Sequence, residues 1–300
     1  MEDYHRFLNP ELVSRLSSME MRARLVVEGF ITGLHRSPYH GFSVEFAEHR
    51  QYMPGDPIRH IDWKAFGKTD RFYIKEFEEE TNLKAHILLD ASGSMAYRSD
   101  LSKGIAKLEY GRYLSAALTY LMLTQQDAVG LTIFASGIRS YLPPRSARTH
   151  LHTVLKELNR VDPAETTDVA ATFHQLAERI RRRGLIIIIS DLLDEPDKIL
   201  LGLKHFRHNK HEVLVFHVLD PFEKSFAYRR EAIFRDLETG EEVTTQPWHI
   251  RGEYVRAMTA LTGRYRRECR DSLIDYVPLD TSVPFDRALF AYLSKRGRLG

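Results

Sequence analysis

Residues 86–95 read His-Ile-Leu-Leu-Asp-Ala-Ser-Gly-Ser-Met, and this stretch decides the fold. A short apolar run that ends in an acid on a tight loop is typical of a parallel strand whose carboxyl end carries function. A second run of this kind, Leu185–Ser190, is apolar on both faces and is followed directly by Asp191. Such strands are expected where helices cover both sides of a parallel sheet.

Short apolar strands alternate with amphipathic helices from residue 84 onward. Repeated strand-helix-strand order predicts an α/β fold with a doubly wound, mostly parallel sheet. We expect the strands at residues 86–89, 129–134, 185–190, 213–219 and 274–277. We expect the helices at residues 108–125, 149–159, 170–182, 196–208, 252–270 and 280–296.

The first 83 residues have a different composition from the rest. A helix is predicted at residues 12–31, followed by a stretch rich in glycine, proline, histidine and aromatic residues. Short alternating runs at 42–46 and 72–77 predict strands there. We therefore divide the chain into an N-terminal helix with a β-rich element, residues 1–83, and an α/β domain, residues 84–300. Within the second part, residues 236–242 suggest a hairpin, with Gly240 in the turn.

Two strand ends carry the candidate metal ligands. Asp90, Ser92 and Ser94 place one carboxylate and two hydroxyls on the first loop, and Asp191 follows the second strand. The carboxyl ends of parallel strands meet at one edge of the sheet, so these groups are expected to converge. Hard oxygen ligands of mixed charge suit Mg²⁺ or Mn²⁺. The alternative is that the first three residues only cap a following helix.

The motif Asp90-Ala-Ser92-Gly-Ser94 resembles the first metal-binding motif of the von Willebrand factor A domains. Those domains have a metal-ion-dependent adhesion site, which a threonine from a second loop and an aspartate after a third strand complete. The resemblance implies that Thr167, in preference to Thr166, and Asp191 fill these two roles. Helix capping before Val169 is the other interpretation of the two threonines.

A second resemblance covers most of the chain, from about Leu25 to the last strand, and concerns a bacterial family called domain of unknown function 58. It implies a von Willebrand factor A-like domain and a partnership with MoxR-type AAA+ ATPases, and it implies no catalytic residues. The residues that carry it are Gly33, His35, Arg36, Ser37, Gly41, Glu45, Phe46, Arg50, Tyr52, Met53, Pro54, Gly55, Asp56, Arg59, Ile61, Asp62, Trp63 and Lys64.

The segment from Arg50 to Lys64 has two physical interpretations. Its alternating charges favour an ion-pair network that fixes the turn at residues 54–56, with Trp63 packed beneath it. The sharper interpretation is a docking surface for a partner, because Arg59 and Trp63 are residue types enriched at binding hot spots.

Composition limits the partners and the compartment. The net charge is +2, which gives no reason to expect nucleic-acid binding. The longest apolar runs are far shorter than the roughly 20 residues that span a bilayer, so we expect no membrane insertion. Cys269 is the only cysteine, and Met1 begins no signal-peptide pattern, so we expect a cytoplasmic protein. The oligomeric state is not predicted.

Two classes of function remain open. The first is a non-catalytic module in which the metal at Asp90 and Asp191 accepts an acidic side chain from a protein partner. The second is a divalent-metal-dependent hydrolase acting on phosphate esters. The sequence favours the first, because Ser92 stands where Asp-x-Asp phosphatases have their second acid and no base is visible beside either serine.

Overall fold

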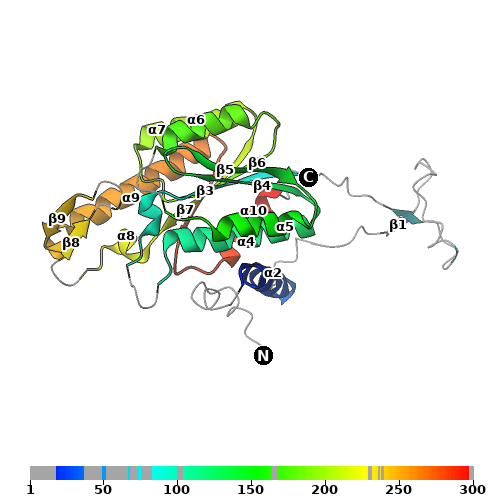
Figure 1. Ribbon diagram of the computed structural model, residues 1–300, viewed down its shortest axis with the longest axis horizontal. Coiled ribbons are helices and arrows are strands. Elements are labelled where there is room, and N and C mark those ends of the chain that lie inside the picture. The colour runs from blue at the N-terminus through cyan, green and yellow to red at the C-terminus, as the bar shows by residue number, and fades with distance from the viewer. Residues whose placement is uncertain are drawn as a thin grey trace.

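The computed structural model describes residues 18–36, 49–51, 67, 73–75, 83–99, 104–163, 168–228, 232–235, 237 and 240–296. Its centre is a six-stranded sheet with the strand order β10-β7-β6-β3-β4-β5 (Figure 1). Neighbouring strands are parallel except β5, which pairs antiparallel with β4. The strands are β3 (Lys84–Asp90), β4 (Ala128–Phe134), β5 (Ile138–Arg145), β6 (Leu185–Ser190), β7 (Glu212–Leu219) and β10 (Asp275–Asp280).

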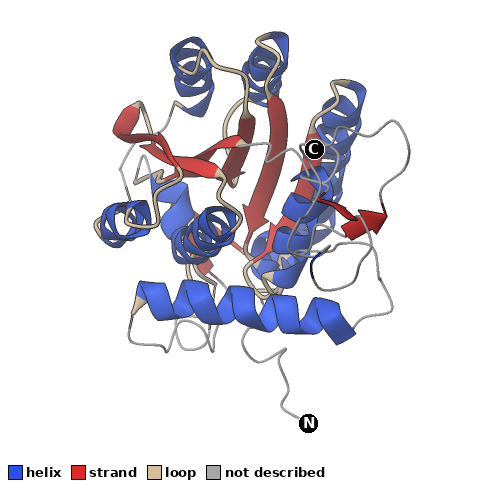
Figure 2. Cartoon of the chain, turned by 90° about the vertical axis from the view of Figure 1, so that its right-hand side faces the viewer, coloured by secondary structure: helices blue, strands red, loops and turns tan. Residues whose placement is uncertain are grey.

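Helices cover both faces of this sheet, which confirms the doubly wound α/β fold (Figures 1 and 2). One layer contains α4 (Lys107–Thr124), α5 (His150–Asn159) and α10 (Asp286–Arg296), with α2 (Met19–Arg36) packed outside α4. The other layer contains α6 (Val169–Arg179), α7 (Pro196–His208) and α9 (Pro247–Asp271). The smaller elements are β1 (His49–Gln51), β2 (Tyr73–Lys75), η3 (Gly93–Ala96), α8 (Pro221–Ser225), β8 (Ala232–Arg235) and β9 (Glu242–Thr245).

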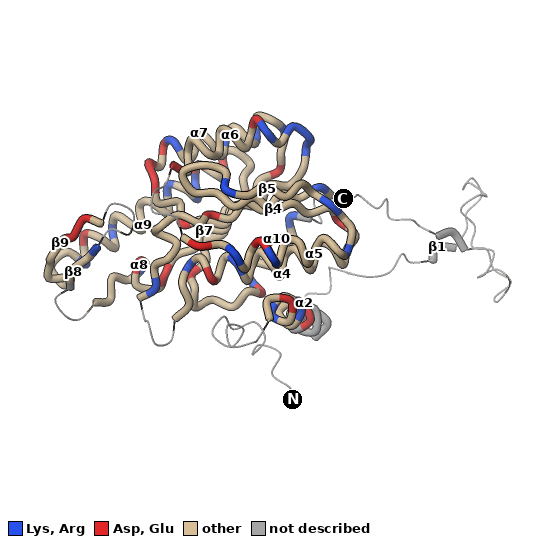
Figure 3. The backbone as a smooth tube through the Cα atoms, viewed as in Figure 1, with Lys and Arg blue, Asp and Glu red and all other residues tan. Residues whose placement is uncertain are grey.

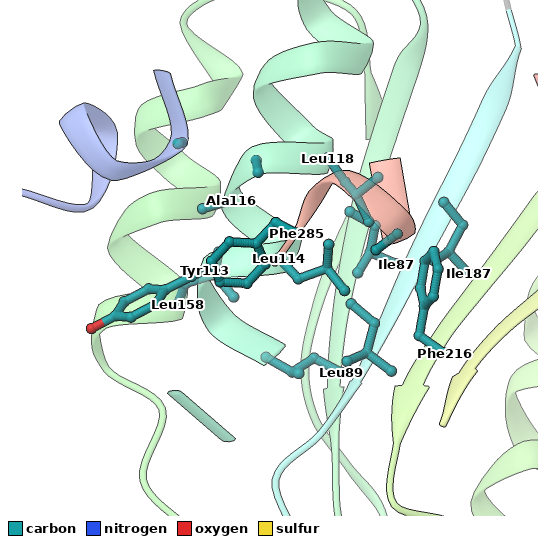
Figure 4. Close-up of a cluster of buried hydrophobic side chains, with 14 of the residues drawn as sticks. Ile87, Leu89, Tyr113, Leu114, Ala116, Leu118, Leu158, Ile187, Phe216 and Phe285 are labelled. Atoms are coloured by element: carbon teal, nitrogen blue, oxygen red, sulfur yellow. The ribbon is translucent and has the colours of Figure 1, made fainter. Parts of the chain in front are cut away.

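The sheet divides the core in two because side chains alternate along each strand. Ile87 and Leu89 of β3 pack toward α4, whereas Leu88 packs toward α6 and α7. Figure 4 shows the first of these clusters, with Leu114 and Leu118 of α4 facing the strands. Full burial of one such side chain contributes about 2 kcal/mol, so the central strands form a rigid frame for the loops at their carboxyl ends.

A glycine brings α4 close to the sheet. A Cβ added at Gly111 would lie only 2.9 Å from Leu89 Cδ1 and 3.2 Å from Ile189 Cγ2. Lys107 lies four residues earlier, so it shares this sheet-facing side of the helix. The close packing therefore points the first residue of α4 at the carboxyl ends of β3 and β6.

The structure corrects several predicted boundaries. The last helix begins at Asp286 and not at residue 280, because β10 continues to Asp280. Helix α9 begins at Pro247, five residues before the predicted start. Strand β5 was not predicted, because its residues are mostly half-exposed and include two prolines, which edge strands tolerate.

The N-terminal predictions are tested only in part. The described portion of the first helix, α2, continues to Arg36, beyond the predicted end at 31, while residues 12–17 lie outside the described chain. Strand β2 lies within the predicted run 72–77 and pairs antiparallel with β1, whereas the run 42–46 is not described. The hairpin around Gly240 is confirmed by the antiparallel pair β8 and β9, with φ of 75° at this glycine. The division at residue 83 stays a prediction.

Candidate metal centre

Asp90 ends β3 at the carboxyl edge of the sheet and is fully buried. Its Oδ1 accepts a hydrogen bond of 2.9 Å from the Ser92 backbone N–H. Its Oδ2 accepts one of 2.6 Å from the Ser190 hydroxyl, at the end of the neighbouring strand β6. The carboxylate is thus oriented by neutral donors from two strand ends, and no cation of the described chain forms a salt bridge with it.

The two serine hydroxyls of the first loop lie side by side. Ser92 is fully buried and Ser94 is half-buried in η3. Their Oγ atoms are 3.1 Å apart. Adjacent oxygen ligands of an octahedral Mg²⁺ ion, each about 2.1 Å from the metal, are separated by about 3 Å. The hydroxyl pair therefore has the spacing of two neighbouring ligands of such an ion.

Asp191 follows β6 and its backbone is fixed by several contacts. His217 of β7 donates from Nε2 to the Asp191 carbonyl oxygen at 2.8 Å. The next residue, Leu192, is buried with φ of 52°, a left-handed conformation that costs about 1–2 kcal/mol for a residue with a branched side chain. Its N–H bonds to the Ser190 hydroxyl at 2.9 Å. Strain of this kind persists where surrounding contacts enforce it, and here they hold the Asp191 loop in place.

The charge of Asp191 acts on the Asp90 carboxylate. Burial and, next, the nearby charge of Asp191 raise the pKa of Asp90 to about 7, against the hydrogen bonds from Ser190 and Ser92, which lower it. Without a cation beside it, Asp90 therefore holds a proton up to neutral pH. A divalent ion bound between the two carboxylates would take the place of that proton.

Asp191 already has a cationic partner. The Lys107 ammonium, with no exposed side-chain surface, lies 2.7 Å from Asp191 Oδ2 and 2.6 Å from Glu223 Oε1. Burial lowers the pKa of Lys107, but the charges of the two carboxylates outweigh burial and the pKa is raised overall. Lys107 is therefore a permanent buried cation at the edge of the candidate site.

The fifth predicted ligand, Thr167, lies outside the described residues. The chain resumes at Asp168, whose side chain caps α6 by accepting from the Ala171 N–H at 3.0 Å. The Thr172 hydroxyl donates to the Ala135 carbonyl, directly after β4, at 3.3 Å. The first turn of α6 thus lies at the same edge of the sheet as Asp90.

The described donor set fits a hard divalent cation. It combines the carboxylates of Asp90 and Asp191 with the hydroxyls of Ser92 and Ser94, all at one sheet edge. In the described residues no group of three or more His, Cys, Asp or Glu side chains could hold a metal. The two carboxylates and two hydroxyls are mixed oxygen donors, which suit Mg²⁺ or Mn²⁺ better than zinc.

Sequence reasoning missed Lys107 and Glu223. A signal for the lysine was present, because a cation in the first turn of a helix faces the unfavourable end of the helix dipole. Such a residue requires nearby negative charge. Glu223 belongs to a capping box with Asp220, and this Asp-x-x-Glu spacing is readable from the sequence. What the sequence could not give is that helix α8 brings Glu223 to Lys107.

Comparison with known protein families assigns the chain to a family. The family model described as "Protein of unknown function DUF58" matches residues 48–263. The chain belongs to this family. An uncharacterised protein of Mycobacterium tuberculosis and one of Mycobacterium bovis are each 25% identical to this DUF58 protein over 295 residues. These alignments cover 97% of this chain and 91% of each relative.

Solved structures similar to this DUF58 protein include two from Bacteroides. The conserved hypothetical protein BatB from Bacteroides thetaiotaomicron is 16% identical, with a TM-score of 0.46, over 73% of this chain and all of the other. An aerotolerance-related membrane protein from Bacteroides fragilis is 19% identical, with a TM-score of 0.45, over 71% of this chain and 99% of the other.

Other sequence expectations meet the structure only in part. The segment from Arg50 to Lys64 is described only at Arg50 and Gln51, so its two interpretations stay predictions.

Within the described residues, no helix has both the length and the apolar character needed to cross a membrane. Basic and acidic residues both occur on α4, α7 and α9 (Figure 3), so none of these three helices has a purely basic surface.

Proposed function

We propose that this DUF58 protein is a non-catalytic, metal-dependent protein-binding module of the von Willebrand factor A type. The observation that carries the proposal is the convergence of the Asp90 carboxylate with the Ser92 and Ser94 hydroxyls at the carboxyl edge of the sheet. These groups would hold the ion together with Asp191, and Thr167 completes the set by resemblance. When bound, Mg²⁺ or Mn²⁺ supplies a cationic coordination position for an acidic side chain of the partner.

The surroundings of Asp191 support a protein as the partner. Leu193, two residues further on, is 40% exposed although it is a large apolar residue. Protein interfaces combine apolar and polar contacts, so a protein partner that reaches the polar site could also cover this leucine. A partner carboxylate at the site would bring its neighbouring residues over this leucine.

The resemblance to the DUF58 family suggests a MoxR-type AAA+ ATPase, or a client of that ATPase, as the partner. We accordingly propose a cytoplasmic location, where such an ATPase has access to ATP. The metal site and the identity of the partner are separate parts of the proposal, and each has its own test.

The metal part is tested by titrating the metal-free protein with Mn²⁺ in a calorimeter. We expect one site, lost in Asp90→Ala and retained in Asp275→Ala, whose carboxylate lies at the opposite end of the sheet. The partner part is tested with the purified MoxR-type ATPase encoded in the same genome. Binding should require Mg²⁺ and disappear with EDTA and in Asp90→Ala.

Equal binding of the ATPase with and without chelator would contradict the metal-mediated mechanism. The segment from Arg50 to Lys64 would then be the better candidate for docking. We also expect no hydrolysis of phosphate esters, because neither buried nitrogen group near the site can serve as a base. Lys107 is held as a cation by two carboxylates, and the ring of His217 bonds to the Asp191 carbonyl and the Tyr276 hydroxyl. Turnover above background that Asp90→Ala abolishes would instead favour a metal-dependent hydrolase.

A further inference from the structure

Lys107 is the buried charge that the proposed metal site does not use. Removal of an ammonium from water costs several kcal/mol, and the N-terminus of α4 adds an unfavourable dipole. The structure compensates this cost with two carboxylates, Asp191 at 2.7 Å and Glu223 at 2.6 Å. One of the two belongs to the candidate metal site, so the lysine and the ion would compete for the same carboxylate.

The two aspartates of the site are held in different ways. Among the described residues, Asp90 accepts hydrogen bonds from two neutral donors, Ser92 and Ser190. Asp191 Oδ2 accepts a hydrogen bond of 2.7 Å from the Lys107 ammonium, while its Oδ1 accepts a longer bond of 3.3 Å from the Leu193 N–H. Charge-assisted bonds are roughly twice as strong as neutral ones, so Asp191 is the less available of the two for direct contact with a metal.

Glu223 fixes the direction of the ammonium. Its Oε2 accepts from the Asp220 N–H at 2.8 Å, and Asp220 caps α8 by accepting from the Phe222 N–H at 2.8 Å. The carboxylate is therefore anchored by a capping box while its other oxygen holds Lys107. Removing Glu223 would leave Asp191 as the sole anion bound to the lysine.

We propose that Lys107 is a positioning residue that keeps Asp191 in the outer shell of the metal, one water away from the ion. This inference rests on the metal site proposed above. A carboxylate shared with an ammonium neutralises the ion less than a directly bound one does. Lys107 thereby preserves the attraction of the loaded site for an incoming carboxylate, which is the chemistry that the partner would use.

The test uses a charge-neutral pair of substitutions, Lys107→Met with Glu223→Gln, so that the net charge of the cluster is unchanged while Asp191 loses its cationic partner. Mn²⁺ is the probe, with affinity measured by calorimetry and bound water by water-proton relaxation. Asp191, now released, should replace a water, so we expect Mn²⁺ affinity to rise about tenfold and relaxation enhancement to fall. Acetate should displace water from the wild-type complex more readily than from the variant.

The single substitution Glu223→Gln gives an independent test with the opposite sign. Lys107 would then pair with Asp191 alone and hold it more tightly. Mn²⁺ affinity should therefore fall severalfold, while the number of water molecules bound to Mn²⁺ stays unchanged. A purely structural role for Lys107 predicts weaker Mn²⁺ binding in the double variant as well.

The outcomes separate the two proposals. Equal affinity and equal relaxation in wild type and double variant would overturn the role of Lys107 and leave the metal site standing. Weaker Mn²⁺ binding in the double variant than in wild type would also overturn the role of Lys107. Absence of Mn²⁺ binding by the wild type would overturn both. If the double variant does not fold, as judged by circular dichroism, Glu223→Gln decides alone, and affinity equal to wild type contradicts the proposal.

Discussion

The two ends of the central sheet bury different kinds of polar group. At the carboxyl end, Asp90, Asp191 and the Lys107 ammonium have almost no exposed surface. At the amino end, Asp127 is buried directly before β4 and accepts a hydrogen bond of 3.2 Å from the Tyr292 hydroxyl. Two histidines are buried there as well, and burial lowers the pKa of His86 to about 4 and also lowers that of His211. Those histidines are neutral at physiological pH.

The ion pairs around Glu212 at the amino end are partly solvated. Glu212 bonds to Lys295 at 2.7 Å and to Arg207 at 2.8 Å, and 18% of its side chain is exposed. Partly solvated ion pairs of this kind have a small desolvation cost, whereas buried ones cost several kcal/mol per ion. The buried lysine with two carboxylate partners thus lies at the carboxyl end, whereas the ion pairs of Lys295 at the amino end reach solvent through Glu212 and Asp275. We infer that the carboxyl end retains its charges for binding and not for stability.

The largest expected difference between the two ends is in metal binding. Asp90→Asn should abolish measurable Mn²⁺ binding, because the amide removes the charge while it keeps the size of the side chain. Asp275→Asn, the matched change at the amino end, should leave Mn²⁺ affinity unchanged. The two variants are compared by calorimetry, with circular dichroism as the check of folding. Equal losses in both would show that metal binding does not depend on the carboxyl end.

A lower pH should destabilise the protein because of the buried histidine His86 at the amino end of the sheet. Because the folded-state pKa of His86 is about 4, below the unfolded value of about 6.5, the unfolded chain takes up the proton first as the pH falls. This residue's contribution is present above pH 6.5 and is lost toward pH 4, by about 3 kcal/mol. Urea unfolding at pH 7.5 and 4.5 should therefore show a smaller loss in His86→Leu than in wild type. Parallel losses would contradict a neutral buried histidine.

A higher pH should strengthen metal binding at the carboxyl end of the sheet. Burial and then Asp191 raise the pKa of Asp90 to about 7 in the metal-free protein, so a proton competes with the metal below that pH. Between pH 6 and pH 8 the ionised fraction rises from about a tenth to about nine tenths, so Mn²⁺ affinity should increase about tenfold. Calorimetry in two buffers of different ionisation enthalpy should detect the released proton. A pH-independent affinity would mean that Asp90 does not titrate in this range.

Ser94 should have the smallest effect. Its hydroxyl is neutral and half-buried, and within the described part of the chain its hydrogen-bond partner is Ser92, so a water molecule can take its place. Ser94→Ala is expected to weaken Mn²⁺ binding on the order of fivefold and to change the free energy of unfolding by less than about 0.5 kcal/mol. Ser92→Ala, at a fully buried position, should cost more in both quantities. A reversed order would mean that the half-buried hydroxyl is the principal serine ligand.

The fold could be predicted because its signals are local. The runs that became β3, β6 and β7 are apolar on both faces, and only a covered parallel sheet accommodates them. The edge strand β5 escaped prediction because pairing with β4, and not its own half-exposed pattern, makes it a strand. The start of α10 was misplaced because the capping residues around 281 lie at the end of a strand that continues to Asp280.

The placement of the two aspartates at one edge of the sheet could be predicted from the strand ends. Asp90 and Asp191 are found by their position after buried strands, since β3 and β6 pair in parallel register. The buried lysine was not found, because its partners come from α8 and from the end of β6, 116 and 84 residues away in sequence. Contacts over such distances depend on packing that no local pattern encodes.

The central claim is that Asp90, Ser92, Ser94 and Asp191 converge on one divalent ion. Crystals grown with Mn²⁺, with anomalous data collected near the manganese edge, test it most directly. The account predicts one strong anomalous peak within about 2.2 Å of the Ser92 and Ser94 hydroxyl oxygens, absent in crystals of Asp90→Asn. Crystals that hold Mn²⁺ elsewhere, or hold none between these side chains at saturating Mn²⁺, would contradict it.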